Sequence, residues 1–148
     1  MRHLFTLLWG LALLVLVSGC KDEHPESSLF NTRWMLVQVE EFPISLSSYG
    51  DTYRSYIEFT GGINRTTGLA PCNSFGGSFT SGKEPSVLTI SQQAATKVSC
   101  GALSLETKYL EALPRTVRYE ITGRELRLYD ASNSLNPLLI FEDRTSTE

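Results

Sequence analysis

Cysteine and histidine are the side chains that most often supply a nucleophile or a metal ligand, and the sequence contains three cysteines and two histidines. Both histidines, His3 and His24, lie near the N-terminus. A domain formed by the rest of the chain contains no histidine, which excludes Ser-His-Asp and Cys-His catalytic arrangements and the usual histidine sites for zinc. Cys72 and Cys100 alone cannot complete a tetrahedral zinc site. We therefore expect a protein that is not an enzyme and has no catalytic residues, no metal ligands and no cofactor.

Adjacent carboxylates are the other side chains that could do chemistry. Glu40-Glu41 and Glu142-Asp143 are the two candidate pairs, and a glycosidase works with two carboxyl groups at a defined separation. Neighbouring positions in a sequence do not define that separation. A solvated surface role is the simpler interpretation, and a carboxylate-dependent hydrolase is kept as an alternative.

The first 20 residues combine an apolar run with a cysteine. The run from Leu4 to Val17 contains fourteen residues, and a helix of that length spans about 21 Å, short of the roughly 30 Å hydrocarbon core of a bilayer. It therefore predicts a signal peptide over residues 1–19 rather than a membrane span. Val17-Ser18-Gly19-Cys20 resembles the lipobox of bacterial lipoproteins, which predicts that Cys20 is lipidated and carries acyl chains such as palmitate. An ordinary secretory signal beside an unmodified cysteine is the alternative.

The residues after Cys20 bear on location. A protein with two or more acyl chains stays on the membrane, so we expect a membrane-anchored protein of the cell envelope. Lys21-Asp22-Glu23 resembles a signal that sends some bacterial lipoproteins to the surface of the outer membrane, although an ordinary polar tether explains it equally well. Residues 20–30 are predicted to form the lipidated cysteine and a flexible tether, and the orientation of the protein, periplasmic or surface-facing, stays open.

Cys72 and Cys100 form an even pair in an oxidising compartment, which favours a disulfide. Closing a loop of about 29 residues would stabilise the fold by roughly 3.5 kcal/mol in the chain-entropy model. Two buried free thiols are the alternative.

Charge argues against nucleic acid as a partner. The formal net charge is −3, and removal of Arg2 with the leader leaves 12 basic and 16 acidic side chains, a net charge of −4. Nucleic-acid binding usually needs a basic face. The 148 residues, 41% of them hydrophobic and 20% charged, suit one globular domain.

The pattern after Phe30 is one of short strands and one helix. Alternation in Tyr53–Phe59 predicts a strand with Ile57 and Phe59 on one face, and Leu126 and Leu128 alternate with Arg127. Ser104–Leu113 is expected to be helical, capped by Ser104 and ended by Pro114, with Leu105, Tyr109, Leu110 and Leu113 on one face. The expected strands cover residues 34–39, 53–59, 63–67, 74–80, 87–90, 117–121, 126–128 and 138–141. The predicted fold is mainly β: a single antiparallel sheet, similar to an incomplete barrel, with one α-helix packed on it.

Several motifs in a fixed order resemble the META domain, also called the HslJ-like domain, over residues 31–142. The resemblance is carried by Asn31–Leu36, which contains Trp34; by Cys72–Phe79, which contains Asn73, Phe75 and Gly77; and by Thr96–Cys100. It implies a compact antiparallel β domain, often periplasmic or lipid-anchored, with some relatives linked to heat stress or antibiotic tolerance. No catalytic residues are carried over, and these motif residues are expected to be structural. Residues 143–148 are predicted to form a disordered tail.

Two classes of function follow from these observations. The leading hypothesis is a non-enzymatic envelope lipoprotein that binds a ligand or protects against stress, with an apolar ligand held between sheet and helix. The second is an assembly factor or inhibitor that binds an envelope protein through an exposed strand edge.

Overall fold

The computed structural model describes residues 27–44, 55–82, 84, 86–133 and 135–144. The predicted signal peptide (residues 1–19), the lipidation site Cys20 and the Lys21-Asp22-Glu23 segment lie outside these residues. No helix among the described residues has the length and apolar character needed to cross a membrane.

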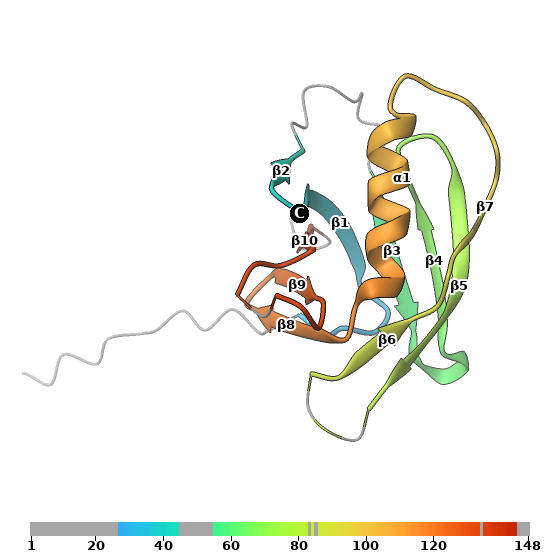
Figure 1. Ribbon diagram of the computed structural model, residues 1–148. Helices are drawn as coiled ribbons and strands as arrows, with labels where there is room; N and C mark the ends of the chain where they lie inside the picture. The colour runs from blue at the N-terminus through green and yellow to red at the C-terminus, as the bar shows by residue number, and fades with distance from the viewer. Residues whose placement is uncertain (1–26, 45–54, 83, 85, 134, 145–148) are drawn as a thin grey trace, which may run out of the picture.

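Antiparallel strands dominate the described chain, as the sequence predicts (Figure 1). The strands are β1 (Arg33–Val39), β2 (Phe42–Pro43), β3 (Tyr56–Thr60), β4 (Arg65–Leu69), β5 (Ser74–Ser81), β6 (Leu88–Ile90), β7 (Ala94–Ala95), β8 (Arg118–Thr122), β9 (Glu125–Tyr129) and β10 (Leu139–Asp143). The helix α1 (Leu103–Ala112) continues into the short 3-10 helix η3 (Leu113–Arg115), and a second 3-10 turn, η2 (Gly61–Ile63), joins β3 to β4.

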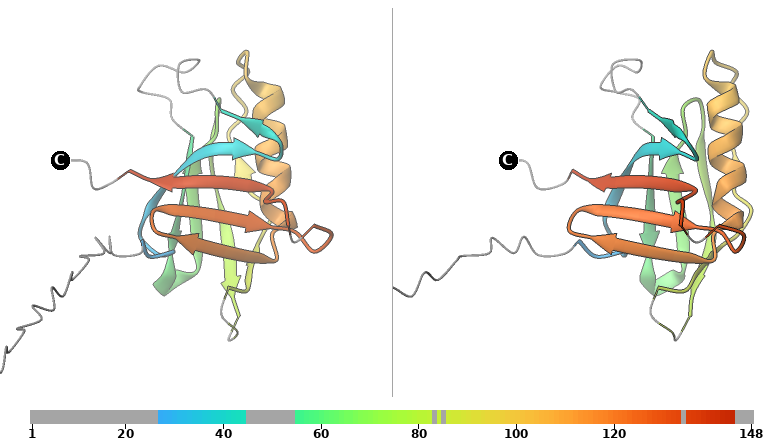
Figure 2. Two further views of the ribbon diagram at one scale, coloured as in Figure 1. Left: turned by 90° about the vertical axis from the view of Figure 1, so that its left-hand side faces the viewer. Right: turned by 60° about the vertical axis from the view of Figure 1, so that its left-hand side comes forward.

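Eight strands form a nearly closed barrel. Their order is β6-β5-β4-β3-β1-β10-β9-β8, with β2 paired to β1 and β7 paired to β5. The two end strands meet: Leu88 N donates to Val117 O at 3.2 Å, and Tyr119 N donates to Ser86 O at 2.8 Å. Figure 2 shows β8, β9 and β10 running across the direction of β3, β4 and β5, so the sheet curls around one interior.

Large side chains fill that interior. Alternation places every second residue of a strand inside, as in β9, where Leu126 and Leu128 are fully buried. The largest fully buried side chains come from both halves of the barrel and from the helix: Trp34, Tyr109, Phe59, Phe141, Ile57, Leu88, Ile90, Leu113, Leu126, Leu128, Leu139 and Val39. The space between sheet and helix, where the sequence suggested an apolar ligand, is thus occupied by the hydrophobic core.

The helix packs against two distant strands. The Tyr109 ring makes an edge contact with Phe75 of β5 at 5.6 Å between centroids and a tilted contact with Phe141 of β10 at 6.1 Å. Both contacts are in the range of favourable aromatic pairs. Since β5 and β10 lie in opposite halves of the strand order, one side chain ties α1 to both halves.

The start of the helix differs from the prediction. The cap is Ala102, without a side-chain hydrogen bond, and Ser104 lies inside the first turn. The backbone explains this: Leu103 N donates to Cys100 O at 3.3 Å, so the Cys100 loop leads into the helix one residue early. Of the expected apolar face, Tyr109 and Leu113 are buried, whereas Leu105 and Leu110 are only partly buried.

Other boundaries shift for local reasons. Residues 61–63 form η2, and Asn64 adopts a left-handed conformation with φ 52°, so β4 begins at Arg65 rather than at Ile63. The two-residue strands β2 and β7 were not predicted because they are too short to show alternation. Tyr53, expected at the start of β3, lies outside the described residues.

The packed domain extends beyond residues 31–142 at both ends. Residues 27–30 were expected to belong to the tether, but Leu29 is buried and Ser27 Oγ donates to Asp143 Oδ2 at 2.7 Å. Asp143, expected in the tail, is the last residue of β10. Residues 145–148 of that predicted tail lie outside the described chain.

Cys72 and Cys100 form a disulfide, as the sequence favours. Replacing both by serine should lower the free energy of unfolding by about 3.5 kcal/mol, because the cross-link limits the unfolded chain. Urea denaturation of the full chain measures the loss, with Ser99→Ala, an exposed neighbour, as the control. A loss no larger than that of the control would contradict a stabilising disulfide.

Candidate functional site

Asn73, a motif residue, is the centre of a buried hydrogen-bond network. Its Oδ1 accepts from Thr96 Oγ1 and from Val98 N, both at 2.7 Å. Its Nδ2 donates to Val98 O at 2.9 Å and to Glu106 Oε1 at 2.6 Å. The side chain is only 2% exposed, so every bond of the amide is made inside the protein. With its bonding capacity used up, Asn73 links the β5 entry, the Thr96 segment and the helix.

Glu106, which lies within the predicted helix, completes this network, and the sequence did not predict a role for it. The carboxylate is 4% exposed, and its Oε2 accepts from Cys72 N at 2.7 Å and from Asn73 N at 2.9 Å. Charge-assisted bonds of this kind are among the strong ones in proteins. An acidic residue one turn before Tyr109 and Leu110, on the expected apolar face of the helix, is the signal that could have identified it.

The remaining motif residues also have structural surroundings. Trp34 is fully buried, and its Nε1 donates to Leu29 O at 3.1 Å. Gly77 lies against the next segment of chain, since a Cβ there would come within 2.5 Å of Gln93 Nε2. These contacts place Trp34 in the core and Gly77 against the Gln93 side chain.

A polar pocket lies elsewhere, at the end of the barrel where β1 finishes and β10 begins. It encloses about 420 Å³, within the size range of small-molecule sites. The lining residues come from the β1–β2 turn, from η3 and from the β9–β10 connection: Gln38, Glu40, Glu41, Phe42, Arg115, Asp130, Ser132, Asn133, Asn136, Pro137 and Leu138. Of these, only Glu40 and Glu41 were singled out from the sequence as candidates for chemistry.

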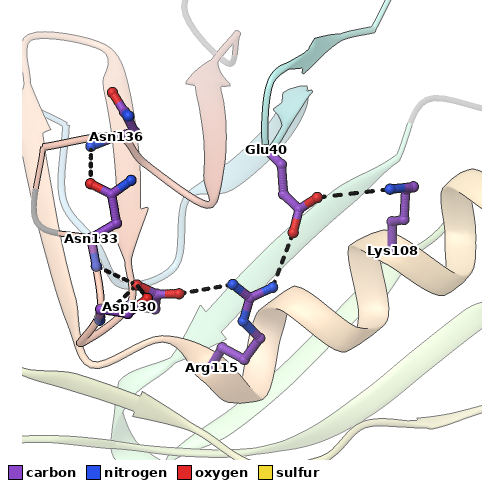
Figure 3. Close-up of polar contacts among 7 residues, drawn as sticks. Glu40, Lys108, Arg115, Asp130, Asn133 and Asn136 are labelled. Carbon is purple, nitrogen blue, oxygen red and sulfur yellow. Dashed lines mark hydrogen bonds and ion pairs between the residues drawn. The ribbon is translucent and has the colours of Figure 1, made fainter.

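Arg115 joins two carboxylates in this pocket, as Figure 3 shows. Its Nη1 donates to Glu40 Oε1 at 3.0 Å and its Nη2 donates to Asp130 Oδ2 at 2.8 Å. Lys108 of α1 adds a longer ion pair, 3.8 Å from Nζ to Glu40 Oε2. The hydrogen bonds to Asp130 and then to Glu40 raise the pKa of Arg115, and the bond from Arg115 lowers the pKa of Asp130. Both groups of the Arg115–Asp130 pair therefore stay charged at neutral pH.

The backbone at Glu40 is strained. Its φ is 51°, in the left-handed region that favours glycine. Glu40 follows β1 in a tight turn in which Val39 pairs with Phe42. Such a residue costs about 1–3 kcal/mol and is retained where the rest of the structure or a function requires it. At this position the strained backbone supplies the carboxylate that meets Arg115.

The β9–β10 connection is held by its own side chains. Asp130 Oδ1 accepts from the backbone N of Ser132 at 3.0 Å and of Asn133 at 2.8 Å. Asn133 Oδ1 in turn accepts from the backbone N of Leu135 at 3.1 Å and of Asn136 at 3.0 Å. Two consecutive turns of this type fix the loop that forms one wall of the pocket.

This arrangement suits binding better than catalysis. The paired charges of Glu40, Arg115 and Asp130 hold one another, and the lowered pKa of Asp130 is the opposite of what a general acid needs. The second predicted pair, Glu142-Asp143, lies on β10, where Glu142 pairs with Arg144 at 2.8 Å. Within the described residues, no group of three or more His, Cys, Asp or Glu side chains could hold a metal ion.

Comparison with known proteins gives one family and two similar folds. The family model described as META domain matches residues 27–143. A protein from Burkholderia xenovorans, solved by NMR, is similar with a TM-score of 0.62 and 19% identity, over 79% of this chain and 84% of that one. A DUF4847 family protein from Bacteroides vulgatus, solved by crystallography, has a TM-score of 0.54 and 14% identity, over 79% and 94%. At these identities the likeness shows the fold alone. A search of curated proteins finds no match.

Replacing Glu106 by glutamine tests the buried network. The amide nitrogen would face a donor of Cys72 or Asn73, so the free energy of unfolding should fall by about 2–3 kcal/mol. Glu111→Gln, on the exposed side of the same helix, is the matched control and should change it by less than about 0.5 kcal/mol. Chemical denaturation of both variants gives the comparison, and equal stabilities would contradict the role of Glu106.

Two substitutions at Glu40 separate backbone strain from charge. Glycine and alanine both remove the carboxylate. Only glycine, which has no Cβ, adopts a φ of 51° without steric strain. We expect Glu40→Gly to be more stable than Glu40→Ala by about 1–2 kcal/mol in urea denaturation. Equal stability of the two variants would mean that the turn carries no strain.

Proposed function

The chain belongs to the META domain family, and we propose that it acts as a lipid-anchored, non-enzymatic binding module of the bacterial cell envelope, with the polar pocket as its binding surface. The position of the pocket is the observation that carries this proposal. The β1–β2 turn and the β9–β10 connection, which line the pocket, lie at the other end of these strands from the point where the described domain begins (Figure 2).

Hydrogen bonds define that starting point. Ser27 N donates to Gly123 O at 3.0 Å, in the turn between β8 and β9, and Ser27 Oγ donates to Asp143 at the end of β10. From this side of the barrel, β1 runs for seven residues to the Glu40 turn, a distance of about 20 Å at about 3.3 Å per residue. An anchor at Cys20 would hold the domain by the Ser27 end and leave the pocket facing away from the membrane.

The anchor itself rests on the sequence. An apolar leader too short to span a bilayer, followed by Ser18-Gly19-Cys20, supports cleavage before Cys20 and acylation of its thiol. We place the protein in the cell envelope for the same reason, and on the outer membrane because Lys21-Asp22-Glu23 resembles a sorting signal of lipoproteins there. A link to stress or antibiotic tolerance comes from the family resemblance and would be served by ligand binding at the envelope.

The pocket favours a non-enzymatic role. A carboxylate hydrolase needs one carboxyl group with a raised pKa to protonate the leaving group. Here Arg115 lowers the pKa of Asp130, and Glu40 is held by Arg115 and Lys108. Charged groups that are held in ion pairs in this way are poorly suited to transferring protons to a ligand.

Two other modes of binding are less favoured by the geometry. An apolar ligand between sheet and helix would have to displace fully buried side chains such as Tyr109 and Leu113. Addition of a partner strand needs a free sheet edge, but the end strands β6 and β8 are linked through the Val87–Arg118 bridge, and the edges of the described sheet at β2 and β7 are only two residues long. The polar pocket needs neither change.

Replacing Cys20 by alanine tests the anchor. We expect the variant to lose metabolic labelling with a palmitate analogue and to accumulate as uncleaved precursor or to leave the membrane fraction, because the acylated thiol is absent. Ser18→Ala keeps a small residue before the cleavage site and serves as the matched control. Normal processing and membrane retention of the Cys20→Ala variant would overturn the proposed anchor.

A further inference from the structure

We propose that the polar pocket binds a neutral oligosaccharide, a chain of hydroxylated sugar rings without charged groups. The inference rests on the proposed function, because it names the class of ligand that the same pocket would take. Three features of the lining residues carry it. The charged groups already form ion pairs with one another, several side-chain amides have unused hydrogen-bonding groups, and one aromatic ring is exposed.

The charges of the pocket disfavour ionic ligands. Arg115 is shared between Glu40 and Asp130, at 3.0 Å and 2.8 Å, so its guanidinium has two anionic partners already. A phosphate or carboxylate ligand would meet these two acidic groups and Glu41 as well. A cationic ligand would compete with Arg115 and Lys108 for the same oxygens. A neutral ligand pays neither cost.

The uncharged polar groups have capacity to spare. Asn133 uses its Oδ1 within the loop, and its Nδ2 has no hydrogen-bond partner among the described residues; the same holds for the whole side-chain amide of Asn136. Gln38 Nε2 donates to Glu40 O at 2.7 Å, which leaves its Oε1 as an acceptor. Amides offer donors and acceptors side by side, and sugar hydroxyls need both.

An aromatic ring completes the set. Phe42 is 57% exposed although it belongs to a strand, and it lines the pocket beside these amides. Lys108 Nζ lies 5.1 Å from the ring centroid, which helps to hold the ring in place. The C–H face of a sugar ring packs on an aromatic face through weak hydrogen bonds and buried apolar area. An exposed phenylalanine with neighbouring amides therefore matches the two faces of a sugar.

Size and rigidity agree with this class of ligand. The space of about 420 Å³ equals the volume of about 14 water molecules at about 30 Å³ each, enough for a sugar ring with its hydroxyls. The Asp130 and Asn133 turns fix one wall of the pocket before any ligand arrives. Such preorganisation lowers the entropic cost of binding a flexible chain.

Saturation-transfer NMR on the full chain tests the proposal, in a detergent without a sugar headgroup. The probes are chitotetraose, an amino-sugar chain of the cell-wall type, maltotetraose, a plain glucan, and a tri-lysine peptide as the charged comparison. We expect at least one tetrasaccharide to receive saturation at its ring C–H protons and to bind with a dissociation constant of about 1 mM or tighter. Binding of chitotetraose alone would indicate a glycan of the cell-wall type, and binding of maltotetraose alone would indicate a plain glucan.

Variants assign the signal to the pocket. Phe42→Ala and Asn136→Ala should each weaken binding about tenfold, and both replace exposed side chains, so the fold is retained. Ile63→Ala, which replaces an exposed residue of η2 that does not line the pocket, is the control and should bind as the wild type does. No transfer to either tetrasaccharide, or transfer that survives both pocket variants, would overturn the proposal. Binding of tri-lysine alone would also reject a glycan but would leave the pocket as a binding surface and the membrane anchor untouched.

Discussion

The packing of Tyr109 between Phe75 and Phe141 is the contact on which the rest of the structure depends. A curled sheet of eight strands leaves an interior to be filled, and burial of large apolar side chains there is the main source of stability. Tyr109 brings the helix into that interior and joins both halves of the strand order. Glu106, one turn earlier in α1, holds the same helix to the disulfide-bonded loop through two backbone N–H groups.

This packing has a consequence for the surface. With α1 fixed on the barrel by Glu106 and Tyr109, the middle of α1 carries Lys108, and η3 carries Arg115, to the place where β1 turns into β2 (Figure 3). The pocket is thus built where three parts of the chain meet, and its geometry follows from the core beneath it. Because the interior is filled, the recognition that we propose uses the end of the barrel, where polar groups meet solvent.

How much of the fold and of the pocket could be predicted from the sequence depends on how far apart the interacting residues lie in the chain. Alternation identified β3 and β9, since burial of every second residue leaves a local pattern, and Ile57, Phe59, Leu126 and Leu128 are buried as expected. The roles of Glu106 and Arg115 were not predictable in this way, because Asn73 lies 33 positions from Glu106 and Glu40 lies 75 positions from Arg115. Ser104 looked like a cap, but the backbone of the Cys100 loop, an element without periodicity, decided where the helix begins.

Native mass spectrometry of the full chain, extracted from its own membrane in mild detergent, tests most directly whether the barrel interior is a core rather than a ligand cavity. Because side chains fill the interior, we expect the measured mass to be that of the polypeptide with its covalent modifications and with no bound apolar molecule. A stoichiometric lipid that stays bound after detergent is released would contradict this, because the space between sheet and helix would then be a binding site.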